Sequence, residues 1–181
     1  MPPNFKCVAL NYFREFLLPI GGLPVGTQPY SFDIGREFFA LTEASEIIDG
    51  QVKVALELSK QEGMIALNFV IAGEVIVACD RCLDDCAQHI EGEYKLILKY
   101  GDHFEEESDE VLIIPLEQHQ FDISRLLYEY IVLLMPMKRV HPDDAQGHPT
   151  CNKEVLKRLE EHRAPAEPDP RWEILKQIKT D

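Results

Sequence analysis

Apolar and polar residues alternate along much of this chain. Segments that alternate, or that form a short apolar run, lie at 30–34, 52–58, 65–71, 75–77, 94–100 and 111–116. A period of two is typical of strands that bury one face. Glycine-containing turns are expected at residues 61–63 and at Gly73 and Glu74. The pattern therefore predicts a mainly antiparallel sheet between about residues 26 and 116.

The pattern then changes to a helical period. From Ile123 to Leu134 the apolar residues fall on one face, Asp122 is placed to cap the helix, and Pro136 is placed to stop it. Asn152 is expected to cap a second helix with a narrow apolar seam. Further on, residues 163–168 have linker composition, and residues 171–179 form a short amphipathic pattern that contains Trp172.

These elements predict an α+β fold, in which a mainly antiparallel β-sheet is packed by one long helix and followed by short C-terminal helices. We expect a single domain at 1–162, and a Pro-rich linker with an amphipathic helix at 163–181. Residues that should be buried between sheet and helix are Leu67, Phe69, Leu96, Leu127 and Ile131.

The composition of the chain limits its partners. Of 181 residues 45% are hydrophobic, and the formal net charge is -14. Such a charge opposes nonspecific binding to nucleic acid, which depends on clustered Lys and Arg, and it favours basic partners. An acid-rich run at 101–110 carries no basic Lys or Arg side chain and is interpreted as a solvated loop.

The number of cysteines and the length of the apolar runs indicate the cellular compartment of the protein. Five cysteines are an odd number, and Arg14 and Glu15 interrupt the apolar character of the first segment. We therefore expect a protein of the reducing cytoplasm. The longest uncharged apolar run, residues 64–73, is shorter than the ~20 residues of a membrane span, so no membrane segment is expected.

The chemistry of the chain centres on a C-x-x-C motif. Cys79 and Cys82 follow an apolar strand, and two cysteines at this spacing can form half of a tetrahedral zinc site. The later segment that could supply the other half contains His141, His148 and Cys151. The alternative is that the two cysteines are reduced thiols in a turn and that the histidines are loop residues.

Two enzymatic alternatives are weaker. A dithiol oxidoreductase using Cys79 and Cys82 would place them at a helix N-terminus, whereas here a meander of strands precedes them, and neighbouring aspartates should raise the thiol pKa. A metallohydrolase built on His141 and His148 lacks a helical ligand spacing such as H-E-x-x-H. With no phosphate loop or nucleophile elbow either, we expect no enzymatic activity.

Three segments together resemble one known family. They are CDRCL at 79–83, FDISRLLYEYIVLLMP at 121–136 and DPRWEILKQI at 169–178. Their order and spacing are similar to those of the YceD-like family, the large ribosomal RNA subunit accumulation proteins. The resemblance extends from about Val52 onward. Many relatives have a cysteine-rich segment after the helix and proline, where this chain has HPDDAQGHPTCN with a single cysteine.

The resemblance implies a non-enzymatic bacterial factor in large ribosomal subunit biogenesis, needed for accumulation or processing of large-subunit ribosomal RNA. The expected partner is a basic ribosomal protein or a large-subunit precursor particle, and any direct RNA contact should be local, through side chains such as Lys138 and Arg139 or those of the second helix. The expected zinc ligands are Cys79, Cys82, His141 and Cys151, with His148 and Cys86 as substitutes.

Overall fold

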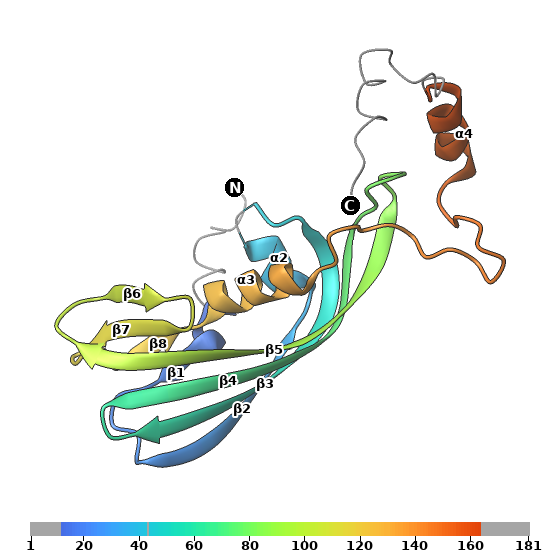
Figure 1. Ribbon diagram of the computed structural model, residues 1–181. Helices are drawn as coiled ribbons and strands as arrows, with labels where there is room; N and C mark the ends of the chain where they lie inside the picture. Colours follow the sequence, from blue (N-terminus) through green and yellow to red (C-terminus); the bar gives the residue numbers. More distant parts are fainter. Residues whose placement is uncertain (1–11, 43, 164–181) are drawn as a thin grey trace, which may run out of the picture.

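The computed structural model describes residues 12–42 and 44–163, and it has two layers: a large curved sheet, and helices packed across one of its faces (Figure 1). The elements in chain order are η1 (Phe13–Phe16), β1 (Leu17–Pro19), β2 (Gly26–Ile34), α2 (Arg36–Leu41), β3 (Ile47–Gln61), β4 (Met64–Ala78), β5 (Asp85–Gly101), β6 (Glu105–Ser108), β7 (Val111–Pro115), β8 (Gln120–Asp122), α3 (Ser124–Leu134) and α4 (Lys153–Glu161). None of the helices in the described part of the chain has the length and apolar character needed to span a membrane.

The main sheet has six strands in the order β2-β3-β4-β5-β7-β6. Strands β2 to β5 form an antiparallel meander, as predicted, but β7 runs parallel to β5, with Ile97 opposite Val111. The sheet is therefore mixed, and the prediction of a mainly antiparallel sheet needs this correction. Alternation reports which face of a strand is buried but carries no information about strand direction. The α+β class itself is confirmed.

Strands β3 and β4 are longer than the alternating segments suggested. The turn between them has Gly63 at φ +84°, as a tight turn requires. The turn expected at Gly73 and Glu74 is wrong, because β4 continues unbroken through both residues. A Cβ atom on Gly73 would lie 2.6 Å from the Cα of Val52, so this glycine allows close approach of the β3 backbone.

Helix α3 covers the sheet and completes the core. The five side chains predicted to be buried are all at most 1% exposed. The Asp122 carboxylate accepts a hydrogen bond of 2.8 Å from the backbone N–H of Ser124, which caps the helix as expected. With 11 residues, however, α3 is of ordinary length rather than long.

The acid-rich segment is partly a strand. Residues Glu105–Ser108 form β6, which pairs with β7 at the edge of the sheet, so the interpretation of 101–110 as a loop is wrong for this part. All four residues of β6 are exposed. Acidic side chains on an exposed edge strand oppose pairing with the strands of other molecules.

Helix α4 lies beyond the end of the sheet, next to the tip of the β4–β5 hairpin (Figure 1). The side chain of Asn152 accepts a hydrogen bond of 3.1 Å from the backbone N–H of Glu154, so the predicted cap is present. None of the residues of α4 is fully buried. The predicted linker and final helix, with Trp172, lie outside the described residues, and the domain boundary at residue 162 stays a prediction.

Candidate metal centre

The C-x-x-C motif forms a tight turn at the far end of the β4–β5 hairpin. The backbone N–H of Cys79 donates to the carbonyl of Asp84, and that of Leu83 donates to the carbonyl of Cys79, both at 2.9 Å. Leu83 takes a left-handed conformation, with φ 63°. The backbone N–H of Arg81 lies 3.4 Å from the Cys79 sulfur and donates to it. These bonds fix the direction of both cysteine side chains.

The segment after α3 is attached to this turn by Arg139. Its carbonyl accepts a hydrogen bond of 2.7 Å from the Asp80 N–H, and its own N–H donates to the Asp80 carboxylate at 2.7 Å. The guanidinium of Arg139 also forms an ion pair with Glu46 at 2.8 Å. The chain is therefore held beside the motif just before His141.

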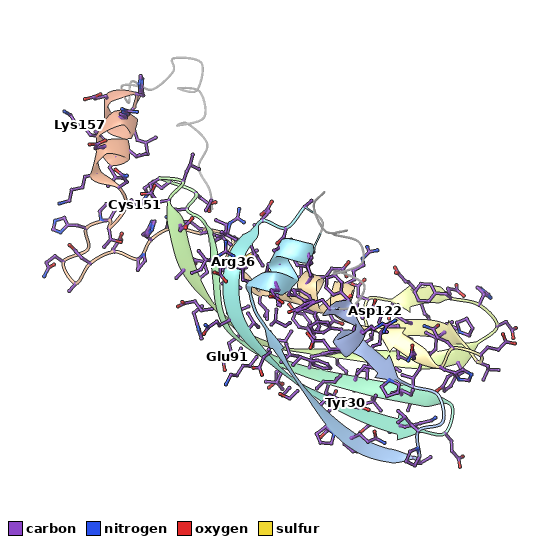
Figure 2. The ribbon with its side chains drawn as sticks, turned by 180° about the vertical axis from the view of Figure 1, so that it is seen from behind. Tyr30, Arg36, Glu91, Asp122, Cys151 and Lys157 are labelled. Carbon is purple, nitrogen blue, oxygen red and sulfur yellow. The ribbon has the colours of Figure 1, made fainter. Side chains whose placement is uncertain are left out.

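The loop from residue 141 to 151 folds back on itself. The Asp144 carboxylate accepts hydrogen bonds from the N–H groups of Gln146 and His148, at 2.9 and 2.8 Å. Thr150 donates its hydroxyl to the Pro142 carbonyl at 2.7 Å. Because the two ends of the loop meet, His141 and Cys151 face the motif together. Figure 2 shows Cys151 at the base of α4, at the end of the molecule remote from Tyr30.

The structure brings together the four residues singled out in the sequence. The donor atoms of Cys79, Cys82, His141 and Cys151 all lie within 4.8 Å of one another. The Cys79 and Cys151 sulfurs are 3.9 Å apart. The Nδ1 atom of His141 lies 3.5 Å from the Cys82 sulfur and 3.7 Å from the Cys151 sulfur. The three cysteines are buried and, together with Cys86, form a small cluster separate from the main core.

This geometry fits a tetrahedral zinc site. Zinc–sulfur bonds of about 2.3 Å place ligand sulfurs about 3.8 Å apart at the corners of a tetrahedron, close to the measured separation. The other ring nitrogen of His141, Nε2, lies 3.0 Å from the Asp85 carbonyl. A proton on Nε2 leaves Nδ1 free to bind a metal, which is the usual arrangement of a histidine ligand. These residues can thus hold a zinc ion in a closed, structural site.

The thiol pKa values differ within the cluster. Burial acts to raise the pKa of Cys79, but hydrogen bonds from the backbone near Cys82, Arg81 and His141 outweigh burial and lower it to about 6. The expectation that neighbouring aspartates raise this pKa is therefore wrong. Burial, followed by the sulfurs of Cys79 and Cys82, raises the pKa of Cys151. A bound cation would oppose this rise by stabilising the thiolate.

Neither substitute ligand is among the four donors that approach one another, although Cys86 packs in the same buried cluster. The Cys86 sulfur accepts a hydrogen bond of 2.9 Å from the Gln88 side chain, and burial raises the pKa of Cys86. His148 is highly exposed and lies 3.4 Å from the Asp144 carboxylate. Sequence reasoning missed Gln88 and Arg139 as supports of this region. Gln88 also donates to the Val140 carbonyl, 52 residues away, and Arg139 bonds to Asp80, 59 residues away, so no local pattern could have indicated these contacts.

The basic residues considered for RNA contact differ in whether acidic side chains already pair with them. Arg139 is engaged with Glu46 and Asp80, so it is unsuitable as a phosphate contact. Lys153, Lys157 and Arg158 are exposed on α4, where glutamates accompany them and Lys157 lies 3.9 Å from Glu161. The local field at α4 is therefore of mixed sign.

Comparison with known proteins adds one finding. The family model described as "Large ribosomal RNA subunit accumulation protein YceD" matches residues 67–179, which include the C-x-x-C motif, α3 and the loop that carries His141 and Cys151. Neither a curated protein nor a solved structure matches the chain.

Proposed function

Because this chain belongs to the YceD family of large ribosomal RNA subunit accumulation proteins, we propose that it acts as a non-enzymatic factor in biogenesis of the large ribosomal subunit. It would do so by binding a basic ribosomal protein or a precursor particle in the reducing cytoplasm. The family match is the observation that carries this proposal. The net charge of -14 supports a basic partner, because opposite charges accelerate and orient association.

The proposal includes a structural zinc ion held by Cys79, Cys82, His141 and Cys151. Its support is the close approach of the four donor atoms and the burial of the three cysteines. Such an ion would join the tip of the β4–β5 hairpin to the segment that leads into α4. It would supply folding free energy to a region whose own apolar cluster is small. Its role would be to fix the position of α4 relative to the sheet.

The alternative, a dithiol oxidoreductase using Cys79 and Cys82, has one supporting observation. The lowered pKa of Cys79 suits a reactive thiolate. Against it, Cys79 is fully buried, and the motif follows a strand rather than opening a helix. A redox pair also needs access for a second thiol, which a closed site with His141 and Cys151 denies.

Deletion of the gene tests the main proposal. We expect a lower ratio of large-subunit to small-subunit ribosomal RNA and an altered sucrose-gradient profile. Complementation with a Cys79→Ser, Cys82→Ser double variant should restore the ratio only in part. Cys86→Ser should restore it fully, because Cys86 is not one of the four candidate metal ligands. An unchanged ratio and profile after deletion would refute the assignment to ribosome assembly.

A further inference from the structure

A groove runs between α3, the edge of β5 and the β6–β7 hairpin, with a volume of about 970 Å³. In Figure 1 the hairpin and α3 lie side by side along β5. We call it the α3 groove. It shares no lining residue with the candidate metal centre.

The groove is open because β5 lacks a neighbour along part of its length. Strand β7 pairs with β5 only from Ile97 to Gly101, so upstream of Ile97 this edge has no partner strand among the described residues. Helix α3 lies across the gap and contributes Leu126, Tyr130 and Leu133 to one wall. An incoming segment can therefore enter along the edge without displacing an element of the fold.

The floor of the groove is aromatic. The rings of Tyr94 and Tyr130 stack with centroids 4.2 Å apart, and Phe69 contacts Tyr130 edge-on at 5.4 Å. Leu133 beside them is 69% exposed. Tyr130 is only 8% exposed. An aromatic floor with an exposed leucine suits a bulky apolar side chain.

The rim of the groove is strongly acidic. Its charged residues are Glu93, Glu106, Asp109, Glu110 and Glu129, together with a single lysine, Lys95. Glu129 is paired with Arg125 at 2.8 Å, and the other four carboxylates form no ion pair with any residue between 12 and 163 that the structure describes. Glu93 and Lys95 project from the face of β5 opposite to Tyr94, so the unpaired negative charge beside the aromatic floor comes from Glu106, Asp109 and Glu110.

We propose that the α3 groove binds a basic segment of another protein, in which a bulky apolar residue lies among lysines or arginines. The carboxylates would pair with its cations, and the aromatic floor would take the apolar side chain. A nucleic acid would be repelled by the same carboxylates, and a second copy of this chain would bring an equally acidic rim. The proposal rests on the proposed function and names the surface that would hold its basic partner.

The probe for this test is a labelled amphipathic peptide of lysine and leucine, added to the full-length protein at low ionic strength. Fluorescence anisotropy measures its affinity, and methyl resonances of Leu126 and Leu133 report where it binds. Matched probes have glutamate in place of lysine, or serine in place of leucine. Both should bind at least roughly tenfold more weakly, because each lacks one of the two recognised features.

Variants of the protein locate the site. The double variant Glu106→Lys, Glu110→Lys, and separately Leu133→Ser, should each weaken binding of the lysine–leucine peptide roughly tenfold. The matched controls are Glu117→Lys and Leu116→Ser, which lie outside the groove. Leu116 is 70% exposed, nearly the same as Leu133, so its substitution controls for loss of an exposed apolar side chain. Both control variants should bind as the unmodified protein does.

Several results would overturn the proposal: equal binding of the glutamate probe, equal affinity of the groove and control variants, or comparable binding of an RNA oligonucleotide. Tighter competitive binding of a peptide with this chain's own residues 169–181 would make the groove an internal docking site instead. Failure of the groove proposal can be distinguished from failure of the proposed function. If gene deletion lowers the ribosomal RNA ratio but the groove variants bind the probe normally and complement fully, only the groove proposal is wrong.

Discussion

Replacement of Cys151 by serine can show whether these residues form a metal site or only a cluster of buried thiols. The Cys151 sulfur lies 3.9 Å from the Cys79 sulfur and 3.7 Å from Nδ1 of His141, so a shared zinc ion would lose one of four ligands. Cys86→Ser is the matched control. Both side chains are buried thiols, at 3% and 1% exposure, but the Cys86 sulfur is bound to Gln88.

The expected loss can be estimated. Removal of a group that only supports a ligand weakens metal binding about 10- to 100-fold, so removal of a ligand itself should weaken it by about 100-fold or more. At saturating zinc this corresponds to about 2.7 kcal/mol of lost stabilisation. The loss should be local. The cysteine cluster is separate from the main core, so hydrogen exchange should quicken around residues 139–161 while the β3–β4 amides stay protected.

Elemental analysis and competition with a chromogenic chelator measure the effect. We expect one zinc ion per chain in the unmodified protein and in Cys86→Ser, and loss of zinc from Cys151→Ser at chelator concentrations that the other two withstand. Equal loss from both variants would contradict the four-residue site. So would an unmodified protein that takes up no zinc after reduction and incubation with the ion.

Three further predictions concern the fold. Leu127→Ala should lower the free energy of unfolding in urea by about 3 kcal/mol because Leu127 is fully buried, whereas Leu133→Ala at the surface should change it by less than about 0.5 kcal/mol. Gly73→Ala should cost about 2 kcal/mol in the same assay, because its Cβ would meet the β3 backbone; an unchanged midpoint would show that β3 can shift freely. Burial, then Glu129, Tyr94 and Glu110, raises the pKa of Tyr130 from 10.0 to about 12. Its folded-state pKa exceeds the unfolded one, so its stabilising contribution is present below pH 10 and lost as the pH rises through about 12, and Tyr130→Phe should remove the late step from an ultraviolet titration.

The sequence by itself determined the elements that depend on local chemistry. Alternation placed Leu67 and Phe69 on the buried face of β4, and a helical period with Asp122 as cap located α3. These features are readable because burial repeats with the period of the element and capping involves neighbouring residues. The C-x-x-C spacing likewise indicated the chemistry of Cys79 and Cys82 before their surroundings were known.

The tertiary structure alone decided how distant segments combine. The parallel pairing of β7 with β5, and the role of Gly73 beside Val52, depend on strand direction and on the approach of another strand, which a one-dimensional pattern does not encode. The meeting of His141 and Cys151 with the motif depends on bonds such as that between Asp80 and Arg139, which are 59 residues apart. The α3 groove likewise exists only because β7 leaves part of the β5 edge uncovered, and its acidic rim combines residues from a helix, two strands and a turn that only folding brings together.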